Sequence, residues 1–334
     1  MALPFDKLLP IARQLAFAKG ASLVRQGEPS RGAFLIQAGT VEAQVALPGG
    51  GMLTVAELGA AEMFGEMALI ERGACSASVR AKSDVSAWFI ERDDFRAMVA
   101  SRDGGALAMQ REITRLLARK LRALNAKVRA HPAEEDRAPH AEASERIDLA
   151  AAPAPPFNWR AFLPLLRFFE GFAAHEIDEL VANGRAVQLP RAASLFEAGD
   201  SPSSAFVVVR GAVEVLSCEG GLERRVALAG PGELVGYLAL LEGAPHAANA
   251  RVRESAAVLE LPAERFRALY EGSSGTSVRL QRAIHGSLLR SLARTNSQLG
   301  RLIAAARLRG AQAEGRTLEA ARGSQLVELV EQPH

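Results

Sequence analysis

The chain has 334 residues, of which 49% are apolar and 23% charged, a composition typical of globular protein and long enough for two domains. The net charge of +2 indicates little about partners, because the charge is unevenly placed. No apolar run is as long as a membrane-spanning helix, and the N-terminus lacks the basic-then-apolar order of a signal peptide. The two cysteines, Cys75 and Cys218, are too few for a disulfide framework or a zinc knuckle. We therefore expect a cytoplasmic protein.

An internal repeat organises the chain. The segment LVRQGEPSRGAFLIQAGTVEAQV, from Leu23, matches LFEAGDSPSSAFVVVRGAVEVLS, from Leu195, at an offset of 172 residues. Further along, FGEMALIERGAC matches VGYLALLEGAPH at an offset of 171. A repeat of this length indicates two copies of a domain and not the unit of a solenoid.

Each copy begins with short alternating apolar runs separated by glycine, in the first copy FLIQAGTVEAQV, MLTVAEL, ASVRA and SAWFI. This pattern predicts a mainly β, sandwich or jelly-roll-like barrel fold with hairpins and flanking helices. Each copy then ends in a helix with a one-sided apolar stripe. The stripes are Met109, Ile113, Leu117, Leu121, Leu124 and Val128 in the first copy, and Leu280, Ile284, Leu288, Leu292, Leu299 and Ile303 in the second.

The predicted domains are residues 1–130 and 159–310. Between them, residues 131–158 are rich in Ala and Pro and carry six acids against two arginines, which predicts a flexible linker. The second copy opens with additional helical sequence, LPLLRFFEGFAAHEIDELVANG. Residues 311–334 have weak periodicity and are expected to form a loose tail.

Both terminal helices are basic. Residues 105–130 carry seven Lys or Arg against one Glu, and residues 276–310 carry seven Arg and no acid. Such helices bind nucleic acid or acidic membrane surfaces in some proteins, but a solvated polar face is the commoner explanation, and we favour it.

The element Phe64-Gly65-Glu66-Met67-Ala68-Leu69, with glycines at Gly27 and Gly39 and a long helix at the end, resembles the cyclic nucleotide-binding domain family. The resemblance covers two copies, as in tandem regulatory proteins of the catabolite-activator and protein kinase A regulatory-subunit type. It implies a receptor for cyclic AMP or a related cyclic nucleotide, with no other cofactor. The alternative is a protein-interaction module that has kept the fold and lost the ligand.

The resemblance implies a ribose and phosphate site in the first copy. In the family, backbone N–H groups of the Gly-Glu turn point at the cyclic phosphate, the Glu binds the ribose hydroxyl, and an Arg forks onto the phosphate. Carried over, Glu66 is expected to bind the ribose, Ser78 to supply a hydroxyl, and Gly65, Met67 and Ala68 to supply N–H groups. The whole expected site is Phe64, Gly65, Glu66, Met67, Ala68, Arg72, Cys75, Ser76 and Ser78.

The first copy departs from the family at Cys75, which stands where the phosphate-binding Arg is expected. Losing a charged bidentate partner costs about 2–4 kcal/mol, or two to three decades in affinity. Arg72 lies on the same loop, but a shifted guanidinium rarely reproduces the fork. Cys75 itself is expected to be an inert, small side chain and not a redox sensor. The sequence therefore predicts weak or altered binding.

The second copy departs further, because Tyr237 replaces the Glu, His246 the Arg, and Asn249 the hydroxyl residue. Cyclic nucleotide binding by this copy is not expected. The degenerate counterpart of the site comprises Gly236, Tyr237, Leu238, Ala239, His246, Ala247 and Asn249.

Other functions find little support in the sequence. The six histidines show no metal-ligand spacing, and no catalytic triad or paired carboxylates stand out, so we expect neither a metal site nor an enzyme. About 25 residues follow the last helix, too few for a helix-turn-helix domain. The long apolar stripe from Ile113 to Val128 predicts a homodimer through this helix, and docking against the second domain of the same chain is the alternative. An effector protein is implied but not identified.

Overall fold

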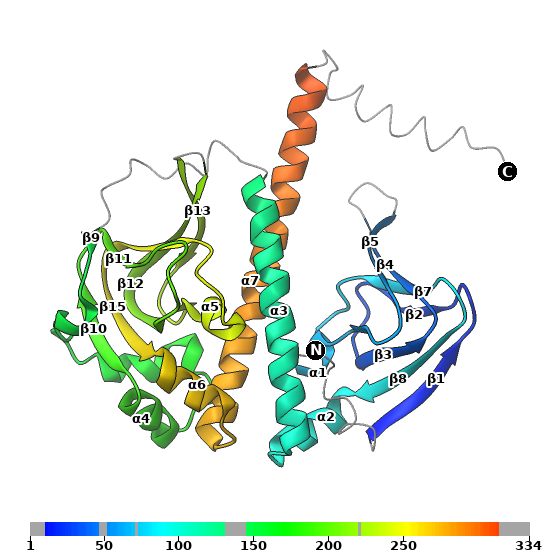
Figure 1. Cartoon of the computed structure of the whole chain (residues 1–334), viewed down its shortest axis with the longest axis horizontal. Helices are drawn as coiled ribbons and strands as arrows, with labels where there is room; N and C mark the ends of the chain where they lie inside the picture. The colour runs from blue at the N-terminus through cyan, green and yellow to red at the C-terminus, as the bar shows by residue number, and fades with distance from the viewer. Residues whose placement is uncertain (1–10, 47–51, 71–72, 131–144, 220–221, 314–334) are drawn as a thin grey trace. The chain divides into compact units, whose positions relative to one another are not determined.

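The computed structural model describes residues 11–46, 52–70, 73–130, 145–219 and 222–313 (Figure 1). The chain divides into two compact units. The first contains Met1–Leu116, Gly171–Leu180 and Glu264–Gly286, and the second contains Leu117–Glu170, Val181–Ala263 and Ser287–His334. The division runs through the two long helices, so that each unit includes a piece of both.

The β-fold of the first copy consists of two four-stranded antiparallel sheets, with strand orders β1-β8-β3-β6 and β2-β7-β4-β5. Buried and partly exposed side chains alternate along β4 and β8, which turns Val41, Ala43, Val85 and Ala87 into one apolar core. The strands are β1 (Ala12–Phe17), β2 (Ser22–Val24), β3 (Gly32–Ala38), β4 (Val41–Ala46), β5 (Met52–Leu58), β6 (Met63–Phe64), β7 (Ser78–Ala81) and β8 (Val85–Glu91).

The β-fold of the second copy contains counterparts of these strands and one additional strand, β9, and its two longest strands are continuous. By the repeat offset, β12 covers the positions of β3 and β4, and β15 covers those of β7 and β8. The strands are β9 (Glu145–Arg146), β10 (Arg185–Leu189), β11 (Ala193–Phe196), β12 (Ser204–Glu219), β13 (Leu222–Ala229), β14 (Leu234–Val235) and β15 (Asn249–Pro262). Their order is β13-β12-β15-β11-β9, with β10 paired to β15 and β14 to β12.

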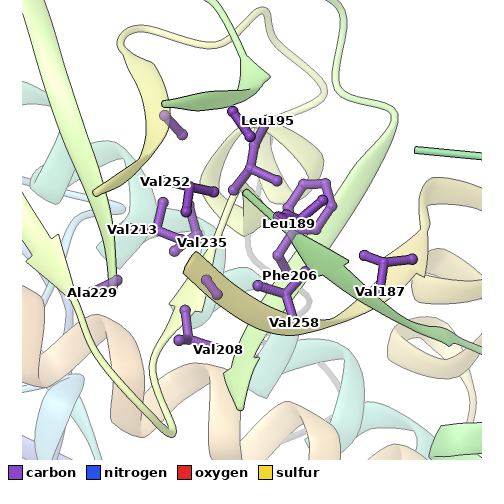
Figure 2. Close-up of a cluster of buried hydrophobic side chains, with 13 residues drawn as sticks. Val187, Leu189, Leu195, Phe206, Val208, Val213, Ala229, Val235, Val252 and Val258 are labelled. Atoms are coloured by element: carbon purple, nitrogen blue, oxygen red, sulfur yellow. The ribbon is translucent and has the colours of Figure 1, made fainter. Parts of the chain in front are cut away.

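A valine-rich core fills the second β-fold. Figure 2 shows side chains of β10 to β15 converging on this core, with Phe206 and Val258 among the fully buried ones. β-branched side chains fit a pleated sheet that is covered on one face, which explains their number here. The predicted jelly-roll-like fold in two copies is confirmed.

The helices have the following bounds: α1 (Met67–Ile70), α2 (Arg92–Ala100), α3 (Gly104–Ala130), α4 (Ala174–Ala182), α5 (Tyr237–Glu242), α6 (Ala263–Glu271) and α7 (Gly275–Ala313), with 3₁₀ turns at Leu149–Ala151, Trp159–Leu165 and Arg167–Phe169. The two predicted terminal helices are therefore α3 and α7. The helical sequence that opens the second copy forms two of the 3₁₀ turns and α4.

Helices α3 and α7 lie side by side and run in the same direction (Figure 1). In the first unit, Gln110 Nε2 donates to Gln281 Oε1 at 2.9 Å, and the Thr114 hydroxyl lies 3.2 Å from Nδ1 of His285. Both pairs are separated by 171 residues, which is the repeat offset. Equivalent positions of the two copies thus face each other across the helix pair, as in a parallel coiled coil.

The apolar stripe of α3 is covered within a single chain. Leu117 is fully buried, Leu121 is 2% exposed and Val128 is 5% exposed, and Leu288 and Leu292 of α7 are buried as well. The prediction of a homodimer assumed that this stripe was uncovered, and that assumption is wrong. The physical reason is that the second copy supplies a matching stripe at the same heptad-like spacing, so that the chain provides its own partner helix.

The predicted linker is partly structured. Arg146 in β9 forms ion pairs with Glu197 and Asp200, and β9 pairs in parallel with β11. The Gln188 N–H donates to the Pro153 carbonyl at 2.7 Å. Residues 145–158 therefore belong to the second unit, while residues 131–144 lie outside the described part of the chain. At the other end, α7 extends to Ala313, and the remaining tail also lies outside the described residues.

Candidate functional site

The Gly-Glu turn of the first copy connects β6 to α1 through Gly65, which has a φ of +73°. A Cβ at this position would lie 2.8 Å from the carbonyl oxygen of Gly32, so that only glycine fits. In the second copy, Gly236 has a φ of +82°, and its Cβ would lie 2.8 Å from the carbonyl oxygen of Ser204. The two turns are thus built by the same close approach to a neighbouring strand.

Glu66 follows this turn and is 4% exposed, although it is ionisable. Phe64, before the turn, is also buried and stacks on Phe34 with ring centroids 4.8 Å apart. The Ala68 N–H, expected to point at a phosphate, donates to the Gly65 carbonyl at 2.9 Å. This i to i+3 bond closes the first turn of the four-residue helix α1, and the phosphate contact stays a prediction.

Backbone hydrogen bonds show that Cys75 and His246 are equivalent. The Gly27 N–H donates to the Cys75 carbonyl at 2.9 Å, and the Gly199 N–H donates to the His246 carbonyl at 2.8 Å. Each residue also donates its own N–H to the carbonyl of the residue after that glycine, at 2.8 and 3.0 Å. The thiol of Cys75 is half-buried and forms no disulfide with another described residue. The position predicted for the missing Arg is therefore the same one in both copies.

Ser78 and Asn249 also share a role, and it is a structural one. The Ser78 hydroxyl oxygen accepts the Gln26 N–H at 3.0 Å, and the Asn249 amide oxygen accepts the Ala198 N–H at 2.8 Å. Both side chains fix the turn before the positive-φ glycine of their copy, Gly27 or Gly199. Because a hydroxyl has one donor in addition to its acceptor sites, Ser78 retains its O–H for a further partner. Ser76 is exposed, and Arg72 lies outside the described residues.

In the second copy, the residues that replace the charged pair are neutral. Burial raises the pKa of Tyr237 to about 12, so that the phenol stays protonated. Burial lowers the pKa of His246 to about 4, despite the nearby carboxylate of Asp200. The His246 ring stacks on Phe196 with centroids 3.7 Å apart. Where the family pattern requires an acid and a cation, this copy presents uncharged aromatic surface.

A large cavity lies in the second copy, within the second unit. Its volume is about 600 Å³, a size typical of small-molecule sites. The walls come from β12 to β14, from the start of α5 and from the second halves of α3 and α7. The degenerate-site residues Gly236, Tyr237, Leu238, Ala239, His246 and Ala247 all line it, whereas Asn249 does not.

The sequence analysis missed the helical wall of this cavity. It is formed by Leu121, Arg122, Asn125 and Arg129 of α3 and by Ser287, Arg290, Ser291, Ala293, Arg294, Thr295, Ser297, Gln298 and Arg301 of α7. The signal was present in the arginines of α7 at positions 290, 294 and 301, which share one helix face, but they were interpreted as a solvated face.

No three His, Cys, Asp or Glu side chains in the described ranges come together as metal ligands would. Among the described helices, none combines the length and the apolar character that crossing a bilayer requires.

Two jelly-roll copies, each with a positive-φ glycine turn, a facing loop and a terminal helix, define a tandem repeat of one domain type. The sequence profile described as cyclic nucleotide-binding domain matches residues 14–102 and 186–273, which is more than half of the chain. The protein therefore belongs to the cyclic nucleotide-binding domain family, and the predicted tandem repeat is confirmed.

Curated relatives match part of the chain. This chain is 33% identical over 102 residues to the cyclic AMP receptor protein of Thermus thermophilus, and the match covers 30% of this chain and 47% of the relative. It is 28% identical over 109 residues to the CRP-like cAMP-activated global transcriptional regulator of Mycobacterium tuberculosis, covering 33% and 47%. The match thus spans about half the length of these relatives.

Among solved structures, the regulatory domain of Toxoplasma gondii PKA, co-crystallised with cAMP, is 17% identical with a TM-score of 0.33. That match covers 87% of this chain and 89% of the other.

Proposed function

We propose that this protein is a regulator that binds a cyclic nucleotide weakly in its first copy. The observation that carries the proposal is Glu66, a carboxylate that is 4% exposed and follows the positive-φ glycine. In the cyclic nucleotide-binding family the acid that follows this glycine binds the ribose hydroxyl, so a carboxylate kept at this position favours a binding role. In the second copy this position is the neutral Tyr237.

The weakness of the proposed site follows from Cys75. A cyclic phosphate that binds beside Ser78 meets a thiol where a guanidinium supplies two charge-assisted hydrogen bonds in the family. The remaining donors are backbone N–H groups and the Ser78 hydroxyl, which are neutral. We therefore expect an affinity lower by two to three decades than that of a site with the Arg, by the cost of about 2–4 kcal/mol for the lost pair.

Calorimetry with cyclic AMP and cyclic GMP tests this proposal. Cys75→Arg is expected to tighten binding ten-fold or more, and Cys75→Lys less, because an ammonium is a point charge without the fork. Glu66→Gln is expected to weaken binding, while Tyr237→Phe, in the second copy, serves as the matched control and leaves it unchanged. If Cys75→Arg binds no more tightly than the wild type, the receptor proposal is refuted.

A ligand-independent interaction module is the second candidate. It is favoured by the missing cation at Cys75 and by the commitment of the Ala68 N–H inside its own turn. The two candidates differ in whether any cyclic nucleotide changes the melting temperature, since only a ligand that binds the folded state raises it.

We also propose that the protein acts without catalysis, in the cytoplasm, on an effector protein. A homodimer stays a prediction, and its surface would differ from the buried stripe of α3. The domain boundaries stay a proposal as well, and limited proteolysis of the full chain tests them.

A further inference from the structure

The cavity of the second copy has an excess of positive charge that the cyclic nucleotide pattern does not explain. Five arginines and one glutamate line it. Arg294 is paired with that glutamate, Glu233, at 2.6 Å, and Arg122 is paired with Glu242. The helical wall therefore contains more guanidinium groups than nearby carboxylates.

Arg290 is a partly buried arginine of this wall that forms no ion pair with a carboxylate of the described residues. Its hydrogen bond goes to the Ser287 hydroxyl at 3.0 Å, and in the described part of the chain no acid lies within ion-pair distance of it. The side chain is only partly exposed, and burial lowers the pKa of its guanidinium from the ordinary value. Glu233 also attracts this charge but is paired with Arg294, so Arg290 is left without an ion pair of its own, and a partly buried cation of this kind favours binding of an anion from outside.

The opposite wall of the cavity is apolar and aromatic. Val215, Val226 and Leu234 face it from the sheet, and the Phe196–His246 stack lies where a phosphate would bind in the family pattern. Arg122 beside this stack is already held by Glu242 and by the Pro245 carbonyl. The polarity of the family site is thus reversed, with an uncharged surface on the β-fold and an arginine without an ion pair, Arg290, on the helix.

We propose that this cavity binds an organic anion with an aromatic body, whose rings lie against the sheet and the Phe196–His246 stack and whose single carboxylate, sulfonate or phosphate is held by Arg290. The volume of about 600 Å³ accommodates a body of two or three rings. A planar guanidinium binds such oxyanions through two parallel hydrogen bonds. This second ligand is distinct from the cyclic nucleotide proposed for the first copy.

Two dyes that differ by one charged group test this proposal with the full chain. The anionic dye 8-anilinonaphthalene-1-sulfonate is expected to bind saturably, with one molecule per chain, and Arg290→Gln is expected to weaken its binding ten-fold or more. The neutral dye N-phenyl-1-naphthylamine has the same rings without the sulfonate, and its affinity is expected to be the same for wild type and Arg290→Gln. Arg282→Gln is the matched control, since Arg282 lies on the same helix, also has a pKa lowered by burial, and does not line this cavity.

Filling the cavity locates the dye. Ser291→Trp on α7 and Ala227→Trp on β13 place an indole in the cavity from two different walls, and each is expected to abolish binding of both dyes while the far-UV circular dichroism spectrum is retained. Two substitutions are used so that a folding defect in one does not decide the result.

Three outcomes overturn the proposal. The first is an equal affinity of wild type and Arg290→Gln for the anionic dye, and the second is dye binding that survives both tryptophan substitutions. The third is displacement of the dye by cyclic AMP in the Glu66→Gln variant, whose first-copy site is weakened. The last would make the cavity a cyclic nucleotide site. Absence of any cyclic nucleotide binding refutes the function proposed for the first copy and leaves this inference standing, because its readout is the dye.

Discussion

Acid is expected to destabilise the protein through His285 in the α3–α7 helix pair. The Thr114 hydroxyl donates to the Gln110 carbonyl at 2.8 Å, so its oxygen accepts a hydrogen bond from the Nδ1–H of His285. Nε2 then carries the lone pair, and it has no hydrogen-bond partner among the described residues. His285 is 1% exposed, so a proton on Nε2 would create a buried charge without an acceptor.

The size of the effect follows from the pKa. Burial lowers the pKa of His285 to about 3 in the folded protein, against about 6.5 in an unfolded chain. Between these values the unfolded state binds more protons, so the free energy of unfolding falls as the pH falls below about 6.5. At about 1.4 kcal/mol per pH unit, the loss between about pH 8 and about pH 5 is about 2 kcal/mol.

Urea unfolding of the wild type and of His285→Asn at these two pH values measures the effect. The asparagine keeps a polar group near the position of Nδ1 and does not titrate, so its loss on acidification is expected to be smaller by about 2 kcal/mol. His246, which also has a lowered pKa, contributes equally to both proteins and cancels in the comparison. An NMR titration in which His285 takes up a proton near pH 6.5 in the folded state would refute the reasoning.

Three further predictions test other parts of the structure. Gly65→Ala is expected to lower the free energy of unfolding by more than Gly27→Ala. Both positions have a positive φ, which costs an alanine about 1–2 kcal/mol, but only at Gly65 does the new Cβ meet a carbonyl oxygen. Equal losses in urea unfolding would contradict this. Arg251→Met is expected to lower the free energy of unfolding by about 3–5 kcal/mol, because it removes the guanidinium whose Nη2 lies 2.9 Å from Oε1 of the buried Glu214 carboxylate. Calorimetric melting of the double variant, with Glu214→Leu added, should show a smaller loss. Leu121→Asp is expected to lower the melting temperature without changing the mass from light scattering, because Leu121 is buried inside one chain, and halving of the mass with unchanged melting would show that α3 joins two chains.

The amino-acid sequence by itself determined the repeat, the β-fold of each copy and the turns around Gly65 and Gly236. These features depend on short-range rules: alternation along strands, apolar spacing along helices, and glycine where the chain passes close to another strand. The sequence also placed Cys75 and His246 at one equivalent position, which the backbone hydrogen bonds bear out. Local chemistry was sufficient at these places because each rule acts within a few residues.

Only the tertiary structure decided what covers the stripe of α3 and where the cavity lies. Gln110 and Gln281, or Thr114 and His285, are 171 residues apart, and nothing in the local sequence around either member indicates that they meet. From the sequence, the arginines of α7 fit a solvent-exposed helix face. Only the tertiary structure shows that Arg290 lines a cavity together with residues of the sheet. Side chains from distant segments acquire a common environment only when the chain has folded, and burial and charge compensation, which govern binding, are properties of that environment.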